Sequence, residues 1–294
     1  MSKTGTVRAN GQDLYYEVHG EGQPLVLVMG IGYDSSLWTL AQVPALSRKF
    51  QVVIFDNRDA GRSSQATSAY TIADMADDTA ALMDALGIKK AHVCGLSMGG
   101  MIAMEFALRH PDRLDRMILT GAPGAPARAV FHPIINWNWV KANDKTGETF
   151  ACQFTWLFST AFLRNKEAVQ QTVAMLSSNP NPVNPQAYDR QAQAFLKFVV
   201  LNRLAGVKSR TLCIVGEQDI THASARVPRG RRQDSGRQVR SDQRQRLVPR
   251  RADRASERLQ RPRHEVPVLI LEFSFISVAR PLHPKEKSLC VTKP

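Results

Sequence analysis

The sequence has few cysteines, and their spacing matches no disulfide framework or metal site. The four are Cys94, Cys152, Cys213 and Cys290. Residues Met1–Thr4 lack the apolar stretch of a secretion signal. The longest late apolar run, Val266–Val278, is interrupted and too short to span a bilayer. We therefore expect a cytoplasmic protein with no membrane partner and no bound metal.

Acidic residues are scarce in one block, and lysine is missing from it. Residues 226–263 hold fourteen arginines and only four acidic residues. This block carries most of the formal net charge of +13, so the rest of the chain is nearly balanced. Three origins stay open: a nucleic-acid-binding arm, a disordered basic tail, or sequence never selected as protein. The block has no aromatic residues and no known nucleic-acid-recognition motif, so we expect no specific nucleic-acid partner.

Short apolar runs alternate with helical patterns along the first 220 residues. Two runs, 24–29 and 51–56, are nearly all apolar, as expected for strands buried on both faces of a parallel sheet. Two further strands are expected at 114–120 and 211–216. Thr71–Asp74 resembles a helix-capping start, and apolar residues recur at helical spacing until Gly87. The alternation predicts an α/β protein with a mostly parallel central sheet flanked by helices.

Ser97 lies between Gly95 and Gly99, after an expected strand and before an expected helix. A serine on such a tight turn is forced into a strained conformation that holds its hydroxyl above the sheet edge. A helix beginning at Met98 directs unpaired N–H groups toward the same point. Although a bare glycine-serine-glycine pattern also arises by chance, this context favours a catalytic nucleophile.

These features resemble the α/β-hydrolase family over about residues 8 to 220. The resemblance rests on four segments, each of which follows an expected strand: 29–32, 56–63, 95–100 and 215–219. It implies a Ser-His-acid triad with a serine nucleophile and no cofactor. The family usually has a histidine at the start of the first segment, where this sequence has Met29. Because the oxyanion donor of that segment is a main-chain N–H group, the oxyanion hole can survive this change.

The resemblance implies a role for four residues. Ser97 is the nucleophile, Asp219 is the acid, and the backbone N–H groups of Ile31 and Met98 form the oxyanion hole. Asp219 could instead be only a turn former. Acyl transfer has no further role for the three charged residues of the second segment, so we expect them in turns and ion pairs: Asp56, Arg58 and Arg62.

The catalytic base is missing from its expected place. The family carries its histidine about 25–30 residues beyond the acid, and no histidine of this chain matches that loop. His222 is too close to Asp219, and two later histidines lie in sequence unlike the family, His264 and His283. The remaining four precede the acid: His19, His92, His110 and His132. We therefore expect a weakly active or inactive chain.

The segment boundaries follow from these features. We expect a hydrolase core at 1–123 and 206–224, a helical cap at 124–205, and an Arg-rich tail at 225–294 that is disordered or frameshifted. The cap segment is rich in aromatic residues, which more often form a core than a binding site. Near a pocket mouth they favour an apolar or aromatic ester or lactone as substrate.

Several functions are compatible with the glycine-serine-glycine turn at Ser97. The first is hydrolysis of a carboxylic ester or lactone. Haloperoxidase-like perhydrolysis without a cofactor and C–C bond hydrolysis are chemical alternatives, because fold does not choose the reaction. A non-catalytic hydrolase-like binding protein is the alternative that the missing histidine supports. The sequence leaves the oligomeric state open.

A frameshift between about Asp219 and Gln233 would explain the unfamiliar tail. With synonymous codons chosen freely and read one nucleotide later, residues 233–236 become Arg-Ile-Pro-Gly, and residues 247–267 become a family-like loop and amphipathic helix. We expect the intact mass of the native product, measured by mass spectrometry, to differ from that of this sequence. A matching mass would exclude a sequencing error.

Overall fold

The computed structural model describes residues 2–126, 128–143 and 158–215. Of the expected site residues, Ser97, Ile31 and Met98 lie within these ranges. Asp219 and the whole expected tail 225–294 lie outside the described residues, as does part of the expected cap, 144–157.

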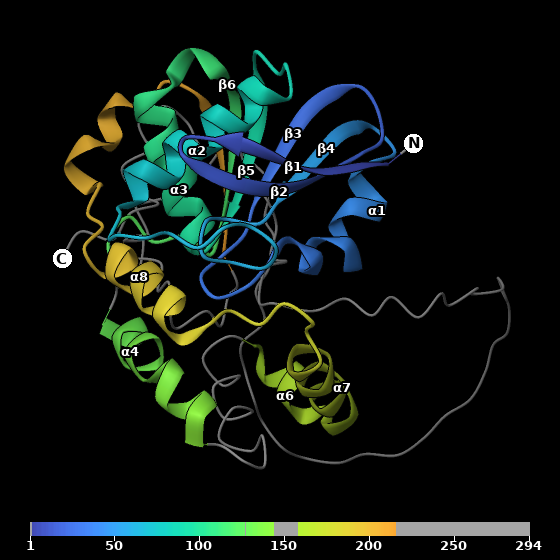
Figure 1. Cartoon of the computed structure of the whole chain (residues 1–294), viewed down its shortest axis with the longest axis vertical. Helices are drawn as coiled ribbons and strands as arrows, with labels where there is room; N and C mark the ends of the chain where they lie inside the picture. The colour runs from blue at the N-terminus through green and yellow to red at the C-terminus, as the bar shows by residue number, and fades with distance from the viewer. Residues whose placement is uncertain (1, 127, 144–157, 216–294) are drawn as a thin grey trace, which may run out of the picture. The chain divides into compact units, whose positions relative to one another are not determined.

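The described residues form a seven-stranded sheet (Figure 1). Its strands are β1 (Lys3–Ala9), β2 (Gln12–His19), β3 (Gln23–Val28), β4 (Phe50–Phe55), β5 (Ala91–Leu96), β6 (Leu114–Thr120) and β7 (Arg210–Ile214). Their order across the sheet is β1-β2-β4-β3-β5-β6-β7. All pairs from β4 to β7 are parallel, and β2 runs antiparallel to β1 and β4. The predicted mostly parallel α/β architecture is confirmed.

The first two strands form a hairpin. Asn10 and Gly11 connect them with φ angles of 48° and 75°. Both values lie in the left-handed region that a type I′ turn requires, and an Asn-Gly pair tolerates this region best. The hairpin adds its second strand antiparallel to β4, beside the parallel part of the sheet.

The central strands are buried on both faces, as their apolar sequences predict. In β3, Val26 and Val28 pack into one hydrophobic cluster, whereas Leu25 and Leu27 pack into another. Successive side chains of a strand point to opposite faces, so this alternation assigns one cluster to each face. Each strand therefore stabilises two layers at once.

Helices cover both faces of the sheet. The first cluster includes residues of α2 (Ile72–Ala85) and α3 (Met98–Arg109), and the second includes residues of η1 (Ser35–Leu40) and α1 (Gln42–Leu46). Figure 1 shows α2 and α3 on one side of the strands and α1 on the other. Thr71 and Asp74 form the predicted capping box of α2, and Gly87 follows its end at φ 70°.

The described residues between β6 and β7 are mainly helical. They form α4 (Arg128–Asn143), α6 (Thr160–Arg164), α7 (Lys166–Ser177), α8 (Pro185–Leu196) and the short η4 (Leu201–Gly206), while η2 (Pro111–Arg113) precedes β6. Ser159, Asn165 and Asn184 cap three of these helices by accepting backbone N–H groups. Most described aromatic side chains here join the core, including Trp137 and Phe162, whereas Trp139 is 63% exposed.

Replacing Gly99 with alanine should strongly destabilise the fold. A Cβ on Gly99 would lie 2.0 Å from the Val28 carbonyl oxygen, so α3 could not pack against the end of β3. We expect the free energy of unfolding, measured by urea titration, to fall by about 3 kcal/mol or more. Gly206→Ala is the control, because its Cβ would meet only the flexible end of Leu108 at 3.1 Å. A Gly99→Ala cost no larger than the control would contradict this packing.

Candidate active site

Ser97 occupies the sharp turn between β5 and α3. Its backbone angles are φ 53° and ψ −117°, a conformation that costs a non-glycine residue about 1–3 kcal/mol. The Ser97 N–H donates to the Thr120 carbonyl at 2.9 Å, and the Ser97 carbonyl accepts from the amides of Gly100 and Met101. These bonds from β6 and α3 hold the strained residue in place. The Ser97 residue is half-buried, not packed in the core.

Three glycines around Ser97 make the turn possible. A Cβ on Gly95 would lie 2.1 Å from the Gly99 carbonyl oxygen, and one on Gly100 would lie 2.1 Å from Cβ of Ala122. Together with the contact of Gly99 at Val28, these distances leave no room for a side chain. The glycine pattern that pointed to a nucleophile is therefore a packing requirement at this turn.

The loop after β3 lies beside Ser97. A Cβ on Gly30 would meet Cβ of Ser97 at 3.4 Å and its Oγ at 4.0 Å. Neither the Ile31 amide nor the Met98 amide donates a hydrogen bond to any described residue. The Met98 amide is also the first of α3, where the helix dipole favours negative charge. Both expected oxyanion donors are thus free of described acceptors and lie in segments that adjoin Ser97.

The last described strand ends at the same edge of the sheet. The Gly121 amide, just after β6, donates to the Ile214 carbonyl at 2.9 Å, and β7 runs parallel to β6. Parallel strands bring their carboxyl ends to one edge, where open α/β sheets bind ligands. Asp219 follows the end of β7 by five residues. Its own position lies outside the described residues, so its role stays a prediction.

None of the described histidine side chains hydrogen-bonds to Ser97, and the buried Nδ1 of His92 has no hydrogen-bond partner among the described residues. His19 contacts Glu17 at 2.9 Å, His92 lies 3.2 Å from Asp115, and His110 contacts Asp77 at 2.7 Å. Burial lowers the pKa of His92, although Asp115 opposes this effect. The other four histidine side chains lie outside the described part: His132, His222, His264 and His283. The structure therefore identifies no base for Ser97 among the described side chains.

The charged residues after β4 form buried polar networks. The carboxylate of Asp56 accepts from Ser35 and from the backbone and guanidinium of Arg62. Arg58 pairs with Asp78 through two hydrogen bonds of 2.6 and 2.5 Å. Burial raises the pKa of Asp78, and its bonds to Arg58 oppose that rise. The predicted ion-pair and turn roles of Asp56, Arg58 and Arg62 are confirmed.

Two neighbours on α8 connect that helix to the core, and sequence reasoning missed both. Arg190 donates two hydrogen bonds to the fully buried Asp59 carboxylate, at 2.8 and 2.6 Å. Gln191 accepts from the Gly32 amide at 2.9 Å and donates to the Arg58 carbonyl at 3.0 Å. Gln191 is fully buried. The residue that fixes the loop beside Ser97 thus comes from a helix more than 150 positions later.

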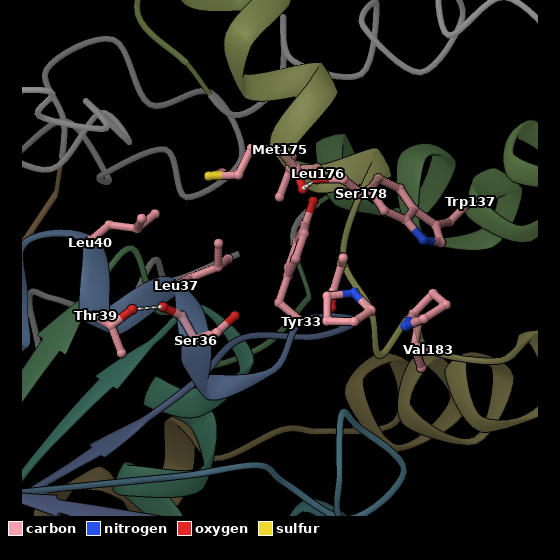
Figure 2. Close-up of a pocket in the computed structure, with 14 residues that line it drawn as sticks. Tyr33, Ser36, Leu37, Thr39, Leu40, Trp137, Met175, Leu176, Ser178 and Val183 are labelled. Atoms are coloured by element: carbon pink, nitrogen blue, oxygen red, sulfur yellow. Dashed lines mark hydrogen bonds between the residues drawn. The ribbon is translucent and has the colours of Figure 1, made fainter. Parts of the chain in front are cut away.

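A cavity of about 280 Å³ opens next to the same loop (Figure 2). Its walls come from the Gly32–Tyr33 turn, from η1, from Trp137 of α4, and from the end of α7 with the chain that follows. Ser97 is not among the described residues that line it. The described residues also contain no cluster of three or more potential metal ligands. No described helix combines the length and apolar character that a bilayer span requires.

Comparisons with known proteins decide the family. A family profile described as alpha/beta hydrolase fold matches residues 23–166. RutD of Azorhizobium caulinodans, a protein named for carbamate hydrolysis, is 32% identical over 214 residues, which cover 70% of this chain and 77% of that protein. This chain belongs to the α/β-hydrolase family.

Further relatives agree with this assignment. A RutD protein from Caulobacter sp. strain K31 is 40% identical over 129 residues. The match covers 42% of this α/β-hydrolase and 46% of the Caulobacter protein, so the chain spans about half of that relative. The enol-lactonase from Burkholderia xenovorans LB400 has a similar solved structure, with a TM-score of 0.64 and 30% identity. That similarity covers 74% of this α/β-hydrolase and 83% of the other chain. The predicted family and fold are confirmed.

Removing the Gln191 amide should destabilise this α/β-hydrolase. Leucine at position 191 would leave the half-buried Gly32 amide and the buried Arg58 carbonyl without their partner, which costs about 2 kcal/mol. Urea unfolding of Gln191→Leu measures this loss. Gln193→Leu is the matched control, because Gln193 is exposed on the same helix, and it should change stability by less than about 0.5 kcal/mol. Equal effects of the two variants would contradict the bridge.

Proposed function

We propose that this chain is a serine hydrolase of carboxylic esters or lactones that uses a Ser-His-Asp type mechanism. The observation that carries the proposal is the strained turn at Ser97, which adjoins the loop 29–32 and begins α3. Strain at a non-glycine residue persists only where the surrounding structure enforces it, and such residues cluster at active sites.

In the proposed reaction, the Ser97 hydroxyl attacks the substrate carbonyl carbon. A histidine takes the hydroxyl proton as the Ser97 Oγ–carbon bond forms, and the carbonyl oxygen becomes an oxyanion. The Ile31 and Met98 amides donate to that oxyanion. Losing one such donor raises the activation barrier by about 3 kcal/mol. The histidine then protonates the leaving alcohol, and water releases the acid from Ser97 in a second, equivalent step.

Asp219 has the role of orienting the histidine in this scheme. Its support is the chain order of the family and its place just after β7, whose end adjoins the end of β6. The names of the relatives support acyl chemistry, because opening an enol-lactone and hydrolysing a carbamate both begin with attack on a carbonyl carbon. The apolar or aromatic character of the substrate is supported by one aromatic side chain of the segment 124–205, Trp137, which lines the cavity beside the loop.

The missing histidine sets the expected rate. None of the described histidine side chains hydrogen-bonds to Ser97, so Ser97 has no identified base among them. Losing one triad member leaves a residual acceleration of about 10³–10⁴ over water from the oxyanion hole and binding. We therefore propose that the chain hydrolyses esters slowly. The same observation supports the second candidate, a non-catalytic binding protein of hydrolase ancestry.

Labelling with a fluorophosphonate probe, together with a p-nitrophenyl acetate assay, tests the proposal. We expect slow labelling and slow hydrolysis, both lost in Ser97→Ala, because the hydroxyl is the reacting group. Ser177→Ala is the control, since Ser177 is exposed at the end of α7, and it should match the original chain.

Other outcomes of this assay discriminate between the candidates. Labelling that survives in Ser97→Ala would contradict Ser97 as nucleophile. No labelling of the original chain would favour the binding protein. Fast hydrolysis that Ser97→Ala removes would support the serine hydrolase and contradict the impairment.

A further inference from the structure

The cavity beside the Gly32–Tyr33 turn has a lining without charge. None of the described residues that line it is acidic or basic. Its apolar walls include Leu37 and Leu40 of η1, Met175 and Leu176 of α7, and Val183. At about 280 Å³ it lies at the lower end of ligand-pocket volumes, which suits one part of a ligand.

A neighbouring carboxylate is already satisfied. Asp34 is buried, and its side chain accepts from the Asn179 amide at 2.9 Å and from the backbone amide and hydroxyl of Ser36. These bonds join η1 to the chain after α7 and so close one side of the cavity. Asp34 itself is not among the described residues that line the cavity.

Polar side chains also line the cavity. Four of them donate to described acceptors: Ser36, Thr39, Ser178 and Asn179. The Tyr33 hydroxyl differs from these four. This hydroxyl makes no hydrogen bond with any described residue. Burial raises the pKa of Tyr33, so the hydroxyl stays protonated and can donate. The Tyr33 ring packs edge-on against Trp137 with 6.1 Å between ring centroids, which fixes its direction. Figure 2 shows the hydroxyl directed toward the end of α7, near Ser178. A half-buried donor held in this way is ready to bind an acceptor.

The cavity is close to the expected oxyanion hole along the backbone. Tyr33 follows Ile31 by two residues, so their Cα atoms lie at most about 7.6 Å apart. The Gly32 between them is fixed by Gln191. A group bound at Tyr33 could therefore belong to a molecule whose reacting carbonyl lies near Ile31.

We propose that this cavity binds an uncharged, mainly aliphatic group that carries one oxygen acceptor, and that Tyr33 selects it by donating a hydrogen bond to that oxygen. The role of this group as part of the substrate rests on the proposed hydrolase function. A carboxylate of the same length binds more weakly, because no described lining residue carries a positive charge that would offset the cost of removing the carboxylate from water.

Binding of two matched probes tests the proposal without any need for turnover. We expect saturation-transfer NMR on the full chain to show that 2-heptanone binds at least about ten-fold more tightly than heptanoate at pH 7. Tyr33→Phe removes only the donor, so it should weaken 2-heptanone binding about five-fold. Equal or tighter binding of heptanoate, no binding of 2-heptanone, or no effect of Tyr33→Phe would overturn the proposal.

Filling the cavity gives a second, independent variant. Val183→Phe places a larger side chain in the lining and should weaken 2-heptanone binding at least about ten-fold. Val199→Phe is the matched control, because Val199 is 57% exposed and does not line the cavity, and it should leave binding unchanged. Circular dichroism confirms that both variants fold. A folded Val183→Phe variant with unchanged binding would place the ligand elsewhere.

The failures of the two proposals are distinguishable. Ser97→Ala should retain 2-heptanone binding, since Ser97 does not line the cavity. If labelling of Ser97 fails and the ketone still binds, the cavity assignment stands and the hydrolase function falls. If labelling of Ser97 succeeds and the ketone does not bind, the hydrolase function stands and the assignment of the cavity is wrong.

Discussion

The close approach of α3 to the end of β3 is the constraint on which the site depends. Gly99 lies against the Val28 carbonyl, Gly95 lies against Gly99, and Gly30 lies against Ser97. With no side chains in the way, the strand, the turn at Ser97 and the loop 29–32 share one small volume. The turn at Ser97 has a conformational cost, and three hydrogen bonds hold it there: one from the Ser97 amide to the Thr120 carbonyl, and two from amides of α3 to the Ser97 carbonyl. The chemistry we propose needs that proximity, because an attacking hydroxyl and its amide donors must reach the same carbonyl.

A second layer of contacts fixes the loops around this volume. Asp56 and Arg62 are tied to η1 through Ser35, and Asp59 is tied to α8 through Arg190. Gln191 joins both sides, because it contacts the Gly32 amide and the Arg58 carbonyl. Breaking a buried pair of this kind costs more than the pair itself contributes, since one partner stays buried without compensation. The helix α8 and the loop beside Ser97 are therefore coupled in position.

The segment 29–33 adjoins the turn at Ser97 at one end and lines the cavity at the other, and the two ends differ in chemistry. The end next to Ser97 has two backbone amides without described acceptors, and the cavity has the Tyr33 phenol in a lining whose described residues carry no charge. An ester or lactone has the same division, with one polar reacting carbonyl and a less polar remainder. This match gives a physical basis for choosing among substrates of one family, which the fold alone does not supply.

The sequence by itself determined the α/β class, the capping box at Thr71 and the turn at Ser97. Local rules govern these features: strand burial, turn conformation and helix capping act within a few residues. It also indicated that Asp56, Arg58 and Arg62 form ion pairs, without naming their partners. Only the tertiary structure decided that Arg190 and Gln191 meet the loops after β4 and β3, and that Tyr33 faces a cavity closed by the chain after α7. Contacts across more than 130 residues depend on how helices pack, and no local pattern encodes that packing.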